Sequence, residues 1–578
     1  MRLKYFIGYG FLLFFLFNRC ANPVTPEGGP KDILPPKVIE CNPPALTTFF
    51  HKSDIRITFN KFIQLKDPGT QVTISPPNLP HTDIRLHGKS ILIKLNDSLK
   101  TNTTYSINFG DAISDLNENN ILHDFSYTFS TGPFIDSLSF TGMIINASDL
   151  APQKDVFSML YVNENDTLPL DSLPLHVKPY YIAKSKEDGW FTFRNLRNVP
   201  FLLFALKDMN GDYIFNLPNE KIAFSDSLIK GIYLPPLSPD SMKKDSIKRK
   251  DSLVPGDTMK RIHLSPPGIT LRLFEESDSI QRILKADLVN EGELGIFFRF
   301  PAVKPEFVPL NISPGSGWMM PEFNSSNDSV YLWLNAITND SLILQVRDRG
   351  KILDTARIDL TKKSPRKKGN KPHAEIPKLV LSNNMSDGRL NSFKNNPLIT
   401  FNYPLSTFDL KRILLVDGKD TVKAAASFSD SLKRRLVVKH KWKEDQKYRL
   451  ILPDSIFHSL NNRSNDSLII SFRTYSIQDF GSIQLSVDIK KPSGNYIIQL
   501  LDDKESILDR QVLTTSGKVK FDYLFPGKYK VKAVFDKNRN GHWDTGKYSL
   551  KLQPEEVRYY QQVIEVRANW DIDENWVL

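Results

Sequence analysis

A long internal repeat limits what this chain can fold into. The stretch "DGWFTFRNLRNVPFLLFALKDMNGD" returns downstream as "SGKVKFDYLFPGKYKVKAVFDKNRNGHWD". Gly189 and Asp208 are 19 positions apart, and so are Gly517 and Asp536, which places the copies at an offset of 328 residues without a gap. Each copy belongs to a predicted β unit and ends in an acidic stretch. The chain is therefore predicted to contain the same β domain twice.

A second repeat precedes each copy of the first. The tetrapeptide ITFN stands at Ile57–Asn60 and again at Ile399–Asn402, and Tyr448 is placed like Tyr105. Short runs that alternate apolar and polar residues, separated by Asn, Asp and Gly turns, are typical of a β-sandwich of about a hundred residues. The two repeats together predict a unit of two sandwiches that occurs twice.

The chain is too long for one hydrophobic core, and its 38 prolines favour β structure with many turns. Strand-like runs between the two units, such as "ITLRLF", "LGIFFRF" and "SVYLWLNAI", predict a fifth sandwich. The predicted fold class is all-β, a multidomain array of β-sandwiches. The expected segments are 1–19 (signal peptide), 20–34 (lipid-anchored tether), 35–132 (first sandwich), 133–235 (second sandwich), 236–263 (charged linker), 264–361 (central sandwich), 362–376 (basic linker), 377–475 (copy of the first sandwich) and 476–578 (copy of the second).

The predicted sandwiches resemble two known families. "IRITFNKFI", "TTYSINFGDAISDLNENN" and "FSYTFSTG" in 35–132 resemble bacterial Ig-like domains, which are also seen in S-layer proteins, and 377–475 is a weaker copy. The segments 133–235 and 476–578 resemble transthyretin-like or carboxypeptidase-regulatory-like sandwiches. The whole arrangement, beginning "CANPVTPEGGPKDILPPKV", resembles Ig-like-domain lipoproteins of the Bacteroidota outer membrane. That resemblance implies a structural or interaction role without catalysis.

The N-terminus has the layout of an export signal. The basic residues "MRLK" precede a thirteen-residue apolar run that is too short to span a bilayer, and Cys20 follows soon after. This order predicts removal of residues 1–19 and acylation of Cys20, although Arg19 stands where such signals carry a small residue. The alternative is an ordinary signal peptide or an uncleaved anchor. If Cys20 is acylated, Cys41 has no partner for a disulfide.

The acidic stretches at the end of each copy are candidate calcium sites. Calcium binds about six to eight oxygen atoms, and alternate positions of a tight loop can converge on one ion. Neither stretch has the glutamate that closes an EF-hand loop, although Glu220 lies one place beyond that position. The alternative is a hairpin held by hydrogen bonds between Asn or Asp side chains and the backbone. The candidate ligands are Asp208, Asn210, Asp212 and Asn216 in the first copy, and Asp536, Asn538, Asn540, the His542 carbonyl and Asp544 in the second.

A three-residue motif, Asp followed by Ser or Thr and then an apolar residue, recurs along the chain. It resembles the acceptor motif for O-glycosylation in Bacteroidota. The alternative is turn chemistry, because Asp-Ser before a strand is a favourable turn sequence. The motif begins at Asp97, Asp136, Asp171, Asp226, Asp251, Asp340 and Asp430, among others.

The sequence argues against two functional classes. It contains no G-x-S-x-G, H-E-x-x-H, Walker or G-x-G-x-x-G motif, and its ten histidines show no ligand spacing. Part of the net charge of +11 lies in "KKDSIKRK" and "KKSPRKKGNK", which carry no interleaved aromatic residue and are expected to be solvated linkers. We therefore expect no enzymatic activity, no nucleic-acid partner and no cofactor other than calcium.

The expected function is that of an interaction or scaffold subunit of an outer-membrane protein assembly or export complex. Its expected partners are outer-membrane β-barrels or other envelope proteins, and Cys20 is expected to hold it on the membrane. The residues "ANPVT" after Cys20 lack an early acidic cluster, which favours the periplasmic face over the cell surface. The alternative is a surface glycan-binding lipoprotein that stacks sugars on exposed tryptophans such as Trp442 or Trp570, whereas Trp333 is expected in a core.

Overall fold

The computed structural model describes residues 31–162, 168–233, 268–277, 281–335, 337, 339–361, 379–490 and 494–578. The predicted signal peptide, Cys20 and the linkers 236–263 and 362–376 lie outside these ranges. The chain divides into two compact units, Met1–Glu275 and Glu276–Leu578. Both are built from β-sandwiches, so the fold class predicted from the sequence is confirmed. Within the described ranges, no helix has the length and apolar character needed to cross a membrane.

The first unit begins with a sandwich that contains the first ITFN repeat. Its main sheets have the orders β1-β2-β6-β5 and β4-β7-β9, and β3 pairs with β8 at one side. The core packs side chains from both sheets, and the rings of Tyr105 and Phe129 stack with centroids 5.3 Å apart. The elements are β1 (Val38–Asn42), β2 (Asp54–Phe59), β3 (Ile63–Leu65), α2 (Pro68–Gln71), β4 (Thr73–Ser75), β5 (Asp83–His87), β6 (Ser90–Lys94), β7 (Thr104–Asn108), β8 (Ile113–Asp115) and β9 (Ser126–Ser130).

The second sandwich of this unit is wound from strands in the order β12-β11-β14-β15-β16-β10-β13. The buried apolar faces of β10, β13 and β16 and of β11, β12 and β14 meet in one core. The elements are β10 (Leu138–Asn146), β11 (Phe157–Tyr161), η1 (Leu170–Ser172), α3 (Leu173–His176), β12 (Tyr181–Lys184), β13 (Trp190–Leu196), β14 (Leu202–Lys207), β15 (Lys221–Phe224) and β16 (Ile269–Glu275).

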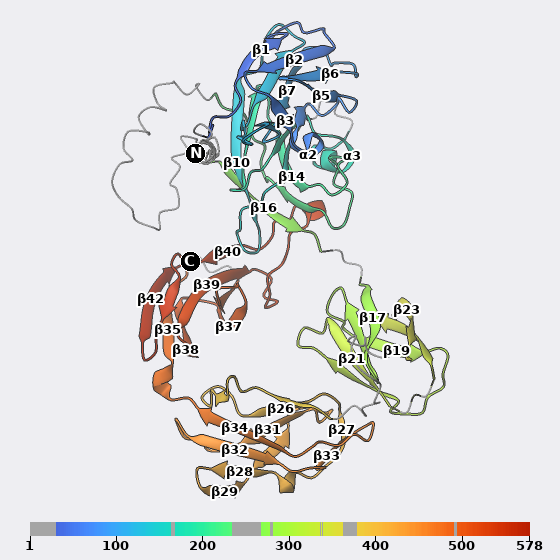
Figure 1. Ribbon diagram of the computed structural model, residues 1–578, viewed down its shortest axis with the longest axis vertical. Helices are drawn as coiled ribbons and strands as arrows, with labels where there is room; N and C mark the ends of the chain where they lie inside the picture. Colours follow the sequence, from blue (N-terminus) through green and yellow to red (C-terminus); the bar gives the residue numbers. More distant parts are fainter. Residues whose placement is uncertain are drawn as a thin grey trace, which may run out of the picture. The chain divides into compact units, whose positions relative to one another are not determined.

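Strand β16 corrects the predicted domain boundaries. The run "ITLRLF" was predicted to belong to the central region, 264–361, but as β16 it pairs in parallel with β10 in the first unit (Figure 1). Its other edge pairs antiparallel with β15. Its Leu271 and Leu273 are buried in the core of the first unit. The prediction was wrong because alternating apolar residues identify a strand but do not identify the sheet that receives it. The second sandwich therefore ends at Glu275, and the predicted linker 236–263 precedes its last strand.

The second unit begins with the central sandwich, whose sheets have the orders β17-β18-β21-β20 and β19-β22-β23. Trp333 on β21 is 1% exposed, as the sequence predicted, but it packs into the core of the sandwich that follows, where its ring meets Tyr403. The strands are β17 (Ile283–Asn290), β18 (Glu293–Phe298), β19 (Pro305–Pro309), β20 (Met319–Phe323), β21 (Ser329–Leu334), β22 (Ser341–Asp348) and β23 (Lys351–Asp359).

The next sandwich contains the second ITFN repeat, and its sheets have the orders β24-β26-β31-β30 and β25-β34-β32-β28-β29, with β27 paired to β33. The hydroxyl of Tyr448 accepts the N–H of Lys443 at 3.0 Å, as that of Tyr105 accepts the N–H of Lys100 at 2.8 Å, so the two tyrosines have the same role. The elements are β24 (Leu381–Asn383), β25 (Arg389–Leu390), β26 (Leu398–Phe401), β27 (Leu405–Phe408), η2 (Leu410–Arg412), β28 (Leu414–Asp417), β29 (Asp420–Lys423), β30 (Ala425–Phe428), β31 (Arg435–Lys439), β32 (Lys447–Leu452), β33 (Phe457–Ser459) and β34 (Leu468–Thr474).

The last sandwich repeats the strand order of the second one. Its sheet β38-β35-β42 corresponds to β13-β10-β16 of the second sandwich, and its sheet β37-β36-β39-β40 corresponds to β12-β11-β14-β15. Strand β42 runs parallel to β35, as β16 runs parallel to β10. The elements are η3 (Ile477–Asp479), β35 (Gly481–Asp488), β36 (Asn495–Leu501), β37 (Ile507–Leu513), β38 (Gly517–Leu524), β39 (Gly527–Asp536), η4 (Tyr548–Leu550), β40 (Val557–Tyr559), β41 (Ile564–Val566) and β42 (Asp571–Val577).

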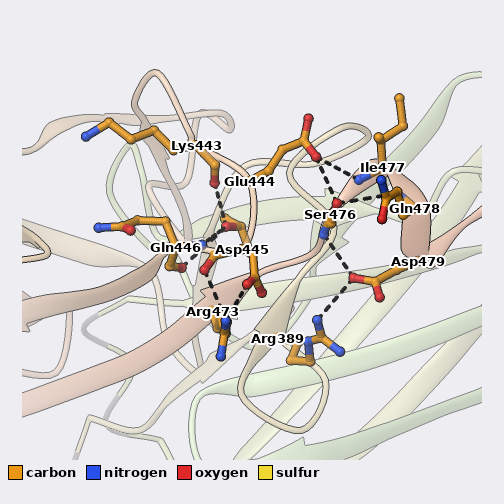
Figure 2. Close-up of polar contacts among 11 residues, drawn as sticks. Arg389, Lys443, Glu444, Asp445, Gln446, Arg473, Ser476, Ile477, Gln478 and Asp479 are labelled. Atoms are coloured by element: carbon orange, nitrogen blue, oxygen red, sulfur yellow. Dashed lines mark hydrogen bonds and ion pairs between the residues drawn. The ribbon is translucent and has the colours of Figure 1, made fainter.

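A short polar junction leads from β34 into the last sandwich. Figure 2 shows the Glu444 carboxylate, which accepts the backbone N–H of Ile477 and the hydroxyl of Ser476, each at 3.0 Å. Asp479 closes η3 by accepting the N–H of Ser476 at 2.9 Å and also pairs with Arg389 at 3.1 Å. The turn between the two sandwiches is therefore held by charged side chains from both flanking segments.

Candidate functional site

The two acidic stretches lie at equivalent ends of the duplicated sandwich. Asp208 follows the buried strand β14, and Asp536 is the last residue of β39, its counterpart. Each stretch then returns to the strand that pairs with β14 or β39, namely β15 or β40. The repeat recognised in the sequence thus places both candidate sites at the same hairpin of the same fold.

In the first hairpin the candidate ligands gather around the turn. One oxygen of Asp208 accepts the N–H groups of Asn210 at 3.1 Å and Gly211 at 2.7 Å, and the other accepts that of Tyr213 at 2.8 Å. Oδ2 of Asp212 accepts the side-chain amides of Asn210 at 2.9 Å and Asn216 at 2.6 Å. All four predicted residues therefore lie in one hydrogen-bonded cluster.

The second hairpin forms a similar hydrogen-bonded cluster. The Asp536 side chain is fully buried and accepts the N–H groups of Asn540 at 3.0 Å and Gly541 at 2.9 Å. Oδ2 of Asp544 accepts the side-chain amides of Asn538 at 2.5 Å and Asn540 at 2.6 Å. Gly541 stands at the position of Tyr213; both have positive φ, and each donates its N–H to Oδ2 of its aspartate. The accepting carboxylate of the cluster lies at different positions, because Asp212 is equivalent to Asn540 and Asn216 to Asp544.

The His542 ligand of the prediction was its carbonyl oxygen. The residue lies in the second hairpin, where its N–H donates to Oδ1 of Asn540 at 3.0 Å. Its ring nitrogen Nε2 lies 3.7 Å from the Asp544 carboxylate, on the exposed side of the turn. The structure therefore brings His542 to the cluster without assigning it a metal-binding role.

Each hairpin also contains a buried glutamate that the predicted ligand sets omitted. Glu220 is fully buried and accepts the N–H groups of Met209 and Asn216, both at 3.2 Å. Glu555 is 7% exposed and accepts those of Lys537 at 2.7 Å and Asp544 at 3.1 Å. The glutamates follow their aspartates by 12 and 19 positions, so a gapless comparison does not align them. Their shared signal is a glutamate shortly before the next strand.

The Glu555 carboxylate lies in an unfavourable place for a negative charge. Burial raises its pKa, and the neighbouring carboxylates of Asp544 and Asp536 raise it further, against the lowering effect of the two backbone N–H donors. A raised pKa means that the folded state binds the proton more tightly than the unfolded chain. This group's contribution to stability is therefore present at low pH and lost as pH rises through its titration range. A bound cation would offset that loss.

The hairpins fit calcium only in part. Oxygen atoms of the predicted residues cluster as the prediction requires, yet side-chain N–H groups of Asn point at Asp212 and Asp544. Among the described residues, no group of three His, Cys, Asp or Glu side chains is placed to hold a metal ion. The bonds found are those of the alternative, a hairpin stabilised by its own side chains. Calcium binding stays a prediction.

Two of the glycosylation motifs place the Asp carboxylate on backbone N–H groups, within a turn at Asp430 but between residues 16 positions apart at Asp97. Asp97 accepts the backbone N–H of His81 at 2.8 Å, and Asp430 accepts those of Arg434 at 3.1 Å and Arg435 at 2.7 Å. The motif at Asp251 lies outside the described residues. Cys41 is a free, half-buried thiol.

Comparison with known proteins supports the Ig-like assignment. Residues 32–131 match the family model described as bacterial Ig-like domain, which covers the first sandwich. No curated protein sequence matches the chain. The prediction of an Ig-like domain at 35–132 is confirmed.

Solved structures with similar folds share little sequence with the chain. The Bacillus anthracis TIE protein is 8% identical, with 96% of this chain and 75% of that chain covered and a TM-score of 0.14. BcpA, the major pilin subunit of Bacillus cereus, is 8% identical over 76% of this chain and 99% of that one, with a TM-score of 0.14. Surface layer protein SbsC, domains 1–6, is 10% identical over 92% and 67%, with a TM-score of 0.14. Likeness at this level carries no argument about function.

Proposed function

We propose that the protein is a non-catalytic interaction or scaffold subunit of an outer-membrane protein assembly or export complex, held on the membrane through an acylated Cys20. The observation that supports this proposal most is a difference between the two copies of the duplicated sandwich. The copies have the same strand order, but one edge strand is covered in the first and exposed in the second.

In the first copy, that edge strand is β12, and the neighbouring Ig-like sandwich covers it. The Ser75 hydroxyl accepts the N–H of Ile182 at 2.9 Å and donates to its carbonyl oxygen at 3.1 Å. Lys184 donates to the carbonyl oxygen of Thr70 at 3.0 Å. Tyr181, Ile182 and Ala183 are all buried. The backbone of this edge therefore already has a partner.

In the second copy the corresponding strand is β37. It pairs with β36 on one side, and its other edge is open among the described residues. Leu508 and Val512 lie on one face, 51% and 52% exposed, and Ile507 is 56% exposed. An open edge with exposed apolar residues can pair with another chain, which soluble proteins usually restrict with charges or bulges. Strand β37 carries Arg510 between Leu508 and Val512 and a register shift at Leu508, and it keeps the apolar pair exposed beside them. Recognition by addition of a β-strand uses such an edge.

A pull-down in mild detergent tests the proposal. The wild-type chain should recover envelope proteins in stoichiometric amounts, and Leu508→Lys/Val512→Lys should lose them because two charges replace the apolar face. Leu550→Lys serves as the control, since Leu550 is 69% exposed in the same sandwich but belongs to η4, outside the sheet that contains β37. Equal recovery by all three proteins would overturn the assignment of the β37 edge.

The alternative, a glycan-binding lipoprotein, finds less support. Trp442 packs edge-on against Tyr448 with centroids 5.0 Å apart, and its indole N–H donates to Asn396 at 2.9 Å, so it offers no open platform. Trp570 is 52% exposed, but the Arg567 guanidinium lies 5.0 Å from its ring centre. Retention of the protein on a polysaccharide column, with no protein partner recovered, would favour the alternative.

We also propose that the two hairpins bind calcium weakly. Turning the side-chain amides of Asn538 and Asn540 would place oxygen instead of nitrogen next to Asp544. Calcium binding in this arrangement replaces the bonds that the two amide oxygens accept from the N–H groups of Asn540 and His542. Two carboxylates give modest charge, so affinity in the extracellular range of about 10⁻⁴–10⁻³ M is expected. The periplasmic location and O-glycosylation of the Asp-Ser/Thr motifs stay predictions.

A further inference from the structure

A polar cavity lies between the two sandwiches of the first unit. Its volume is about 100 Å³, and its walls come from β4, β7 and β9 with the loop before β9 on one side, and from β12, β13 and the loop between them on the other. A water molecule occupies roughly 30 Å³ in the liquid, so the cavity holds one group of a few heavy atoms. It is distinct from the acidic hairpins and from the β37 edge.

Positive charge dominates the cavity wall. Lys184, Lys186 and Arg194 line it together with a single carboxylate, Asp124. Lys186 pairs with Asp124 at 2.5 Å, and Lys184 pairs at 3.0 Å with Asp155, which is not part of the wall. Within the described ranges, Arg194 has neither a hydrogen-bond nor an ion-pair partner. Arg194, an exposed residue of β13, therefore adds an unpaired positive charge to the lining residues.

An uncharged hydrogen-bond donor on the wall also favours an anionic ligand. The side-chain oxygen of Asn108 accepts the N–H of Gly110 at 2.8 Å, which leaves its NH₂ group available. The hydroxyls of Ser106 and Ser126 lie 2.8 Å apart, and that of Ser106 also lies 3.3 Å from the Thr128 hydroxyl, so these three groups bond mainly to one another. The wall thus presents donors in excess of acceptors.

The geometry points to a binding site for a small anionic group, a carboxylate or a phosphate, held between the first Ig-like sandwich and the sandwich that follows it. Arg194 provides a planar pair of N–H donors that matches either anion, and Lys186 provides a second charge. Asn108 lies on the opposite wall, with its NH₂ group available. A ligand in this place contacts both sandwiches and stabilises the first unit as a whole.

Calorimetric titration of the full chain at low salt tests the proposal, with inorganic phosphate, glucuronate and uncharged glucose as probes. At least one anion should bind and glucose should not. Arg194→Gln should weaken binding by about tenfold or more, because a charge-assisted hydrogen bond is lost. Asn108→Asp, which replaces a donor by a negative charge, should abolish it. Added salt should weaken binding to the wild type.

A matched control removes one positive charge elsewhere in the same sandwich. Lys154 is half exposed and pairs with Glu187 at 2.8 Å, and Lys154→Gln should bind as the wild type does. If only phosphate binds, the ligand is free phosphate, and if only glucuronate binds, the ligand is a carboxylate-bearing sugar. Either result supports the proposed anion site. Failure of both anions to bind, or unchanged affinity in Arg194→Gln and Asn108→Asp, overturns it.

Discussion

Substitution of Leu271 by alanine tests the assignment of β16 to the first unit. Leu271 is 2% exposed and packs in the core between the two sheets of the second sandwich. Truncating a buried leucine costs about 2–5 kcal/mol, from lost transfer energy and the cavity left behind. Because β16 lies between β10 and β15, neighbouring strands have little freedom to close the cavity, so we expect the middle of this range.

Hydrogen–deuterium exchange of the whole protein measures this loss of stability, and the central sandwich serves as an internal control. A destabilisation of about 3.5 kcal/mol corresponds to exchange roughly four-hundredfold faster in a cooperative unit. Peptides from β10 and β14 should lose protection, whereas peptides from β18 and β21 of the central sandwich should not. Thr270→Ala, at an exposed position of the same strand, should change little. Loss of protection in the central sandwich instead would refute the assignment.

Three further predictions concern other parts of the chain. The last sandwich should have a higher melting temperature in calcium than in chelator, because calcium at 100 times its dissociation constant adds about 2.7 kcal/mol to the free energy of unfolding. Asp536→Ala should remove the difference. Equal melting temperatures of the wild type in both buffers would exclude calcium binding and favour a hairpin held by its own hydrogen bonds. Arg434→Ala should lower the free energy of unfolding, measured with denaturant, by about 3–5 kcal/mol. The substitution removes the main partner of the Glu322 carboxylate, which is 15% exposed and accepts the indole N–H of Trp333 at 3.0 Å. A change below about 1 kcal/mol would contradict this. Cys20→Ala should move the protein from the membrane to the soluble fraction or leave it unprocessed, and fractionation with acyl labelling decides between acylation and another anchor.

Much of the fold was open to prediction because local patterns specify strands. Two equivalent sandwiches were identified from the alternation around Ile57 and Ile399 and from the placement of Tyr105 and Tyr448. In the structure each tyrosine hydroxyl accepts the backbone N–H of the residue five positions before it. The sheet that β16 joins was not predictable from its own residues, because its pairing partners lie far away in the sequence. Pairing across such a distance depends on the whole sandwich.

The candidate hairpins show a similar limit. Asp208 and Asp536 were found because their spacing from Gly189 and Gly517 is the same. Glu555 was missed because an insertion separates it from Asp536, although it bonds the same backbone positions as Glu220. The exposure of β37 was not predictable either, since only the neighbouring sandwich distinguishes this strand from the covered β12.

Site-specific crosslinking in living cells shows whether the protein acts through its exposed sheet edge. A photoreactive residue replaces Val512 on β37 in one strain and Leu550 on η4 in another, both more than half exposed in the same sandwich. The account predicts that position 512 crosslinks to a defined envelope protein in high yield and that position 550 does not. Equal crosslinking from the two positions, or none from position 512 in membranes that contain the folded protein, would contradict it.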